Sequence, residues 1–245
     1  MHLDRVTIPE GPLSLAGLVY TPGEERSRVL AVVCHGFTAS KESVDILAAY
    51  LAVRGYRALT FDFRGHKLGA STGDLNHASE VLDDLETAAG WGMAQLGYSK
   101  CVLIGHSMGA MASLIVGARI EAAMGVAAIT TGPKPTAGFR QPVGMAMLSQ
   151  RSDYISGAEP MRLLEEFDEL AAAWNGIGDR PSLFIAARGD GVVKPSRVTE
   201  MAERAGQSAE YAEIDGSHLE APHRARGTVA NWLDAHFGQG ERVRG

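Results

Sequence analysis

Short runs of apolar residues recur along the chain and alternate with segments whose apolar positions repeat at helical spacing. The first two strand-like segments, RVTIPE and SLAGLVYT, are separated by a Glu-Gly-Pro turn and predict an N-terminal hairpin. Six further apolar runs predict strands over residues 28–35, 57–63, 100–106, 125–131, 181–187 and 209–215. Continuous apolar runs of this kind are typical of strands that helices cover on both faces. The pattern therefore predicts an α/β fold built on an open, mostly parallel sheet of about eight strands.

One segment, residues 133–180, interrupts this alternation. It contains Pro, Gly, Met and charges of both signs, together with the helix-like stretch PMRLLEEFDELAAAW. The apolar residues of that stretch recur three or four positions apart and share one helical face: Met161, Leu164, Phe167, Ala171 and Trp174. Because the segment is too short to bury a core of its own, we predict a single core domain from residues 1–132 and 181–245. Residues 133–180 would then form a cap inserted over the sheet.

Composition and charge exclude several classes of function. The 245 residues are 45% hydrophobic and 21% charged, which suffices for a sizeable core, and the formal net charge of −6 argues against nucleic acid as a partner. The longest uncharged run contains a histidine and three glycines, so we interpret it as a buried strand and helix rather than a membrane span. The N-terminal residues show no signal pattern, and Cys34 and Cys101 adjoin apolar runs. We therefore expect a cytoplasmic protein with two free, buried thiols.

The stretch VLIGHSMGAMAS places a serine between two glycines, in the order Gly105-His106-Ser107-Met108-Gly109. The serine follows the apolar run CVLI and precedes the helical stretch MGAMASLIVGARI. At a strand-to-helix junction, flanking glycines let the backbone bend tightly and project the hydroxyl above the strand ends. The helix N-terminus there also favours developing negative charge. This context predicts that Ser107 is a nucleophile.

A serine nucleophile needs a base that accepts its proton and an acid that orients the base. Of the eight histidines, His218 lies in a Gly-Ser turn directly after the last predicted strand, at the edge where catalytic groups gather in open α/β folds. Asp190 lies in the turn RGDG after the strand at 181–187. It is favoured over Asp215, which stands in the same turn as His218 and is interpreted as a turn residue. The chain order Ser, Asp, His is the one expected for this sheet.

Two backbone N–H groups are candidates for stabilising the oxyanion. Phe37 follows the predicted strand at 28–35 in the loop CHGFTAS, and Met108 directly follows the serine. His35, in the same loop, is interpreted as structural rather than catalytic. The sequence contains no glycine-rich nucleotide-binding loop and no cluster with metal-ligand spacing, so we expect neither a cofactor nor a metal.

Taken together, these motifs resemble those of the α/β-hydrolase family. The segments CHGFTASKES, DFRGHKLGASTGD, GHSMGAMAS, ARGDGVVKP and DGSHLEAP occur in the family's order and span most of the chain. The chain is most similar to small carboxylesterases and to monoacylglycerol-lipase-like and cinnamoyl-esterase-like serine hydrolases. The resemblance implies an α/β-hydrolase fold, a Ser107–His218–Asp190 triad, an oxyanion hole from Phe37 and Met108, and a cap at 133–180. One departure is the loop RGHKLGAS from Arg64, which is longer than the family's Arg-Gly-His-Gly-x-Ser.

We therefore expect a serine hydrolase that cleaves small-molecule carboxylic esters through an acyl-enzyme on Ser107. Its preferred acyl groups would be small to medium and moderately apolar, with Met145 and Met147 of the run VGMAML in contact with the substrate. Amide or peptide hydrolysis, or acyl transfer to an acceptor other than water, would use the same triad. A non-catalytic binding protein on this fold is a third alternative, and the sequence leaves a homo-oligomer open.

Overall fold

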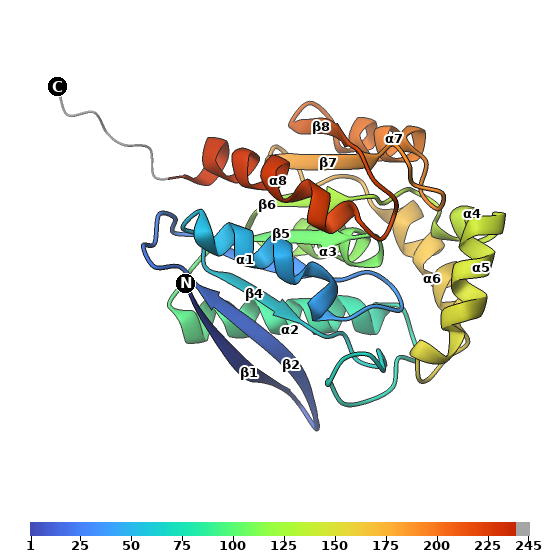
Figure 1. Ribbon diagram of the computed structural model, residues 1–245, viewed down its shortest axis with the longest axis horizontal. Helices are drawn as coiled ribbons and strands as arrows, with labels where there is room; N and C mark the ends of the chain where they lie inside the picture. Colours follow the sequence, from blue (N-terminus) through green and yellow to red (C-terminus); the bar gives the residue numbers. More distant parts are fainter. Residues whose placement is uncertain (239–245) are drawn as a thin grey trace.

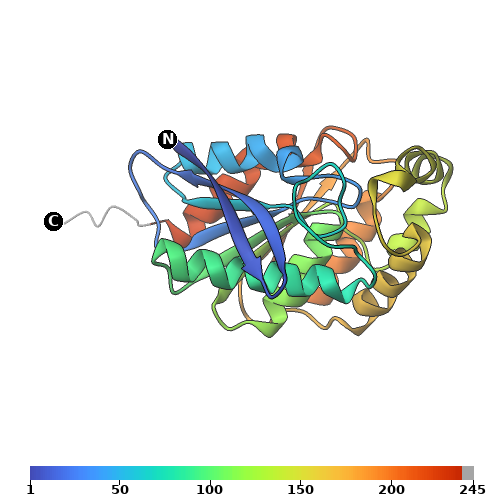
Figure 2. The same ribbon diagram turned by 90° about the horizontal axis from the view of Figure 1, so that it is seen from below.

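The computed structural model describes residues 1–238, and a twisted eight-stranded sheet runs through its centre (Figures 1 and 2). The strands are β1 (His2–Glu10), β2 (Leu13–Thr21), β3 (Leu30–Cys34), β4 (Ala58–Phe61), β5 (Cys101–His106), β6 (Ala123–Ile129), β7 (Ser182–Ala187) and β8 (Ala209–Ile214). They lie in the order β1-β2-β4-β3-β5-β6-β7-β8. The hairpin β1–β2 joins β4 in antiparallel register, and all other neighbouring pairs are parallel. The predicted fold class is confirmed.

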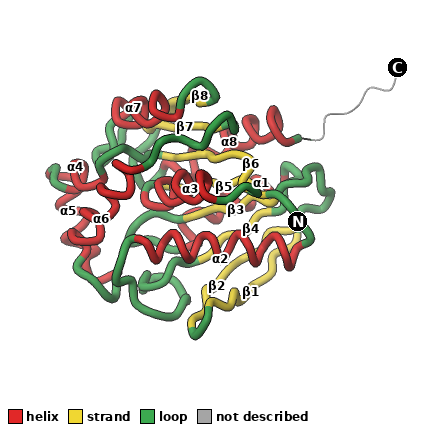
Figure 3. The backbone as a smooth tube through the Cα atoms, turned by 180° about the vertical axis from the view of Figure 1, so that it is seen from behind, coloured by secondary structure: helices red, strands yellow, loops and turns green. Residues whose placement is uncertain are grey.

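Helices cover both faces of this sheet. They are η1 (Lys41–Val44), α1 (Asp45–Val53), α2 (Ser79–Leu96), α3 (Met108–Arg119), α4 (Pro135–Phe139), α5 (Pro142–Arg151), η2 (Ser152–Tyr154), α6 (Pro160–Ala173), α7 (Pro195–Ala205) and α8 (Ala221–Phe237). Figure 1 shows α1 and α8 in front of the sheet, whereas α2 and α3 lie in front of it in the view from behind (Figure 3). Each face therefore has its own apolar core, one under α1 and α8 and the other under α2, α3, α6 and α7.

Burial of the strands explains the apolar runs of the sequence. Every residue of β3, β4, β5 and β7 is buried, because these strands have a neighbour on each side and helices above and below. The edge strands β1 and β8 contain exposed and partly buried positions instead. The continuous apolar segments thus mark the centre of the sheet, and the mixed segments mark its two edges.

The helices α4, α5 and α6 all fall within residues 133–180 and lie together at one end of the molecule (Figure 1). The longest of them, α6, begins at Pro160, and the side chain of Glu159 accepts a hydrogen bond from the Arg162 N–H at 2.9 Å. On its predicted apolar face, Leu164, Phe167, Ala171 and Trp174 are buried, and Met161 is partly buried. The division of the chain into a core domain and a cap stays a prediction.

Both cysteines are free and buried, as the sequence predicts. Burial raises the pKa of the Cys34 thiol and of the Cys101 thiol to about 12. Within residues 1–238, no helix is both long and apolar enough to cross a membrane. Over the same residues, no group of three or more His, Cys, Asp or Glu side chains is arranged to hold a metal ion.

Candidate active site

Ser107 stands at the turn between β5 and α3 with φ at 53° and ψ at −113°. A positive φ is uncommon for residues other than glycine, and such strained positions gather at functional sites. The flanking glycines make the turn possible because the backbones approach so closely. A Cβ atom on Gly105 would lie 2.1 Å from the Gly109 carbonyl oxygen, and one on Gly109 would lie 2.4 Å from the His35 carbonyl oxygen. The Ser107 N–H donates to the Ile129 carbonyl oxygen at 2.9 Å, which ties the turn to the end of β6.

The structure brings Ser107, His218 and Asp190 into one hydrogen-bonded chain. The His218 Nε2 atom lies 3.1 Å from the Ser107 Oγ atom, and the His218 Nδ1 atom lies 2.7 Å from the Asp190 Oδ2 atom. With Nδ1 donating its proton to the carboxylate, Nε2 is free to accept the proton of the serine hydroxyl. The three residues follow β5, β7 and β8, so they converge because parallel strands end at the same edge of the sheet.

Asp190 is fixed by more than its contact with the histidine. Its side chain is fully buried, and its Oδ1 atom accepts hydrogen bonds from the N–H groups of Val192 at 2.7 Å and Val193 at 2.8 Å. Asp215, the alternative acid, is placed differently. Its side chain is 85% exposed and pairs with Arg188 at 2.5 Å. The structure therefore aims the carboxylate of Asp190, and not that of Asp215, at His218.

His106 contributes a contact that sequence analysis missed. Its Nε2 atom donates to the backbone carbonyl oxygen of His218 at 2.9 Å, and the two imidazole rings lie 4.8 Å apart. Burial lowers the pKa of His106 well below its ordinary value, which keeps this ring neutral. His106 thus positions the turn that carries His218. The sequence shows only that His106 directly precedes Ser107, and this position does not predict a hydrogen bond to His218.

The two predicted oxyanion residues both reach the cavity at Ser107. Phe37 and Met108 are each 6% exposed and line that cavity together with the serine. Neither backbone N–H donates a hydrogen bond to an acceptor in residues 1–238, which leaves both available to a ligand. Their role as an oxyanion hole stays a prediction. His35 is buried behind them, where its Nδ1 atom donates to the Gly36 carbonyl oxygen at 2.8 Å and its Nε2 atom accepts from the Phe63 N–H at 3.1 Å.

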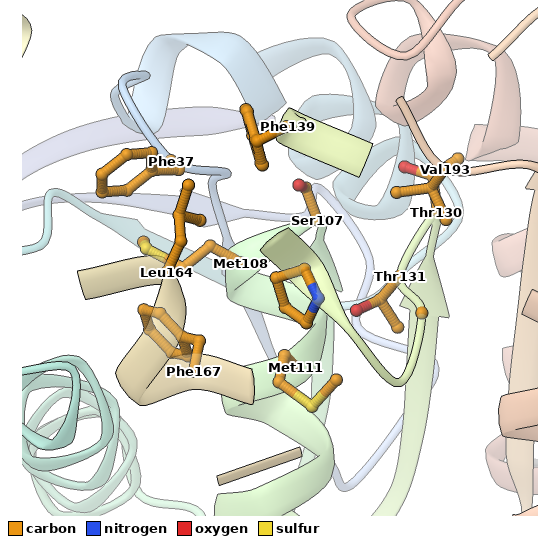
Figure 4. A pocket seen from close by; sticks show the side chains of 12 residues that line it. Phe37, Ser107, Met108, Met111, Thr130, Thr131, Phe139, Leu164, Phe167 and Val193 are labelled. Carbon is orange, nitrogen blue, oxygen red and sulfur yellow. The ribbon is translucent and has the colours of Figure 1, made fainter. Parts of the chain in front are cut away.

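A mostly apolar cavity opens on one side of Ser107 (Figure 4). Its lining residues come from the loop with Phe37, the start of α3, the turn after β6, the helices α4 and α6, and the loop after β7: Phe37, Ser107, Met108, Met111, Thr130, Thr131, Gly132, Pro135, Phe139, Leu164, Phe167 and Val193. We call this space the α6 cavity. Leu164 and Phe167 enter it from α6, so one face of the predicted cap helix forms part of its wall.

A second cavity is also lined by Ser107 and, unlike the α6 cavity, by His218. We call it the His218 cavity. Its lining residues are Gly36, Phe37, Ala39, Ser43, His106, Ser107, Phe139, Met147, Arg151, His218, Leu219 and Pro222. Ser107, Phe37 and Phe139 line both cavities, so the serine hydroxyl stands where the two spaces meet.

The two methionines that were expected to contact substrate are placed differently. Met147 lines the His218 cavity, whereas Met145 is 57% exposed and lines neither cavity at Ser107. Positions two residues apart on a helix point about 200° apart, so one face of α5 cannot present both side chains to the same space. The expectation for Met145 therefore differs from the structure.

A comparison with protein-family models matches residues 25–152 to a family described as serine aminopeptidase, S33. The match covers just over half of the 245 residues. It includes the loop with Phe37 and the turn with Ser107, and it ends before Asp190 and His218.

Solved structures with the same fold cover nearly the whole chain. An esterase from Pyrococcus furiosus superposes with a TM-score of 0.75 at 22% identity, over 97% of this chain and 94% of its own. Est1E from Butyrivibrio proteoclasticus, with ferulic acid bound, gives a TM-score of 0.77 at 14% identity over 94% and 98% of the two chains. The esterase domain of a Rhodothermus marinus protein gives 0.71 at 21% identity over 96% and 99%. These TM-scores establish a shared fold.

Proposed function

This chain belongs to the serine aminopeptidase S33 family of α/β-hydrolases, and we propose that it hydrolyses small-molecule carboxylic esters through an acyl-enzyme on Ser107. The observation that carries the proposal is the hydrogen-bonded chain from Ser107 through His218 to the buried Asp190. These hydrogen bonds lead to the hydroxyl of Ser107, which lines two cavities. A protein that only binds ligands would have no use for a serine held at a positive φ beside a base and a buried acid.

The proposed reaction is acyl transfer to water in two halves. His218 Nε2 takes the hydroxyl proton while Ser107 Oγ bonds to the ester carbonyl carbon, and the N–H groups of Phe37 and Met108 bind the resulting oxyanion. The carbon–oxygen bond to the alcohol then breaks, and the departing oxygen takes the proton from His218 Nε2. A water molecule repeats these steps on the acyl-enzyme and releases the acid. Asp190 holds the imidazole in the required tautomer throughout.

The α6 cavity suits the acyl group of this substrate. Its walls are mainly apolar side chains, and Leu164 and Phe167 limit its depth on the side of α6. An apolar cavity that α6 bounds on one side suits small to medium acyl chains. In this proposal, residues 133–180 serve as a cap because they supply one wall of that cavity.

Peptide hydrolysis is the second candidate because the family description names an aminopeptidase. An aminopeptidase has to bind the free α-ammonium group of its substrate, for which a carboxylate is the natural partner. Among the described residues, no Asp or Glu lines either cavity at Ser107. This lining favours esters, and three of the solved structures with the same fold are esterases by name.

The test is a series of p-nitrophenyl esters from acetate to palmitate, run beside alanine p-nitroanilide as the aminopeptidase substrate. We expect ester hydrolysis that peaks at short or medium chains. Ser107→Ala should lower kcat by a factor on the order of 10⁶. Ser113→Ala is the matched control, because Ser113 lies on the same helix and donates to the Gly109 carbonyl oxygen at 2.7 Å instead of facing either cavity.

Two results would count against this proposal. If Ser107→Ala kept more than about a hundredth of the wild-type kcat, the serine would not be the nucleophile. If the anilide were cleaved faster than every ester, the peptide alternative would replace the ester. A maximum at palmitate would contradict the assignment of chain length alone.

A further inference from the structure

Only one of the two cavities at Ser107 is lined by a permanent charge. No Lys, Arg, Asp or Glu among the described residues lines the α6 cavity, and Arg151 is the single such residue around the His218 cavity. The rest of the His218 cavity is apolar or neutral, including Phe139, Met147 and Leu219. A partly buried guanidinium at the wall of an otherwise apolar cavity suits the recognition of an anion when no carboxylate of the protein pairs with it.

The protein does not neutralise Arg151 within residues 1–238. Of the other arginines in the predicted cap, Arg140 and Arg162 pair with glutamates of α6 at 3.0 and 3.2 Å, and Arg180 donates to backbone carbonyl oxygens. Arg151 has no carboxylate or carbonyl partner in the described chain. Its guanidinium lies 5.9 Å from the ring centre of Tyr154, a contact that leaves its N–H groups without acceptors.

The chemistry of the proposed reaction identifies which part of a substrate would meet Arg151. His218 has to protonate the departing alcohol oxygen, so the alcohol half of the ester must lie on the side of His218. The His218 cavity is on that side and contains Arg151, while the α6 cavity, which His218 does not line, is left for the acyl half. Arg151 therefore faces the alcohol half.

We infer that Arg151 binds an anionic group, a carboxylate or a phosphate, on the alcohol half of the ester. The inference rests on the proposed ester hydrolysis and adds the charge of the leaving group to it. A guanidinium binds either anion through two parallel hydrogen bonds, and its partly buried position strengthens them. The formal net charge of −6 repels anionic substrates in general, so a local cation is needed to hold one.

The test compares matched pairs of butyrate esters that differ in the charge of the alcohol. One pair is 4-carboxyphenyl butyrate and its methyl ester, and the other is butyryl glycerol phosphate and butyryl glycerol. For each pair we measure the ratio of kcat/KM for the anionic ester to that for the neutral one. Comparing this ratio between enzyme variants cancels the intrinsic reactivity of the two leaving groups. If the ratio changes on substitution of Arg151 for only one pair, that pair identifies the anion as a carboxylate or a phosphate.

Arg151→Met should lower the ratio by about tenfold, mainly through KM, because it removes charge-assisted hydrogen bonds and keeps the length of the side chain. Arg151→Lys should keep most of the preference, since a point charge remains. Arg140→Met is the matched control: Arg140 is an exposed arginine of the same region, pairs with Glu165 and lines neither cavity, so the ratio should not change. An unchanged ratio in Arg151→Met, or an equal fall in Arg140→Met, would overturn the inference.

Two further measurements keep the inference testable if a variant does not fold or if no ester is cleaved. In wild type, the ratio should fall as NaCl rises from about 20 to about 500 mM, since salt screens a half-exposed ion pair, and a constant ratio would refute the role of charge. In the Ser107→Ala background, 4-hydroxybenzoate or glycerol phosphate should bind more tightly than its uncharged analogue, and adding Arg151→Met should abolish the difference. Equal binding of the charged and uncharged compounds would overturn the inference about Arg151. Failure to hydrolyse any ester would instead refute the proposed function.

Discussion

Replacing Asp190 by Asn tests the proposed mechanism through a single proton. The Asp190 Oδ1 atom accepts two backbone hydrogen bonds, from Val192 and Val193 at 2.7 and 2.8 Å. These two donors orient the new side chain, because only its amide oxygen can replace Oδ1 as their acceptor. The amide NH₂ group must then occupy the position of Oδ2, 2.7 Å from the His218 Nδ1 atom.

An NH₂ group in that position reverses the tautomer of His218. The Nδ1 atom becomes an acceptor, so the ring proton moves to Nε2, which lies 3.1 Å from the Ser107 hydroxyl and can no longer accept its proton. The loss of the negative charge also removes the partner of the imidazolium that forms in the transition state. Together these effects lower kcat by roughly 10⁴ in enzymes that use such a triad. We expect a loss of this order, about 5 kcal/mol in the activation free energy.

The assay is kcat with p-nitrophenyl butyrate, and circular dichroism with thermal unfolding verifies that the variant folds. The matched control is Asp215→Asn, which makes the same chemical change at an aspartate whose side chain is 85% exposed and paired with Arg188. Exposed ion pairs contribute about 0–1 kcal/mol to stability, and Asp215 does not contact His218, so kcat should stay within about twofold. If Asp215→Asn were the more damaging variant, or if Asp190→Asn kept a tenth of the activity, the assignment of the acid would be wrong.

Two further predictions concern stability. Burial lowers the pKa of His35 to about 4, whereas a histidine in the unfolded chain titrates near 6.5. The unfolded state therefore binds a proton that the folded state does not as the pH falls from 6.5 to 4. The free energy of unfolding should fall by about 3 kcal/mol over this range. Urea unfolding between pH 7.5 and 4 should show at least this loss, because burial also lowers the pKa of His66 and of His106. His35→Gln should make the dependence less steep, and an equally steep curve in the variant would contradict the argument. Gly109→Ala should destabilise the fold by about 1–3 kcal/mol in the same assay, because its Cβ atom would meet the His35 carbonyl oxygen at 2.4 Å. Gly90→Ala, on α2 with nothing within 4 Å of the new Cβ atom, should be neutral or stabilising, and the opposite ranking would refute the steric argument.

The fold could be predicted from the sequence because each central strand is buried on both faces. Such strands leave a continuous apolar run, and β3, β4, β5 and β7 lie inside the predicted runs. The ends of the strands differ from the predicted runs. Hydrophobicity continues into the neighbouring turns, so the run predicted at 28–35 is longer than the strand Leu30–Cys34. In the opposite direction, β6 starts at Ala123, before its predicted run at 125. Hydrogen-bond register, which depends on the neighbouring strands, sets these boundaries.

The placement of Ser107, Asp190 and His218 could be predicted for a related reason. Each follows a parallel strand, and parallel topology alone brings such positions to one edge of the sheet. The contributions from α5 could not be predicted in this way. Whether Met145 or Met147 faces a cavity depends on how the helix is rotated, and packing against the rest of the molecule decides that rotation. The position of Arg151 at the end of α5 and the hydrogen bond of His106 to His218 also depend on contacts between residues far apart in the sequence.

The lengthened loop from Arg64 contacts the predicted cap, which its sequence alone does not predict. Its backbone pairs with η2 and the segment that follows it: the Lys67 N–H donates to the Tyr154 carbonyl oxygen at 2.9 Å, and the Ser156 N–H donates to the Gly65 carbonyl oxygen at 2.8 Å. The loop thus joins the predicted cap to the core through backbone hydrogen bonds.

The same loop is also tied to the segment that carries Phe37. The buried carboxylate of Asp62 accepts from the Ala70 N–H at 2.8 Å and from Lys41 through both its N–H at 2.8 Å and its Nζ atom at 2.6 Å. A Cβ atom on Gly69 would lie 2.3 Å from the Asp62 carboxyl carbon, so this close approach requires glycine. One carboxylate therefore connects the lengthened loop to the loop with the oxyanion candidate. The lengthened loop therefore contacts both the segment that carries Phe37 and the predicted cap.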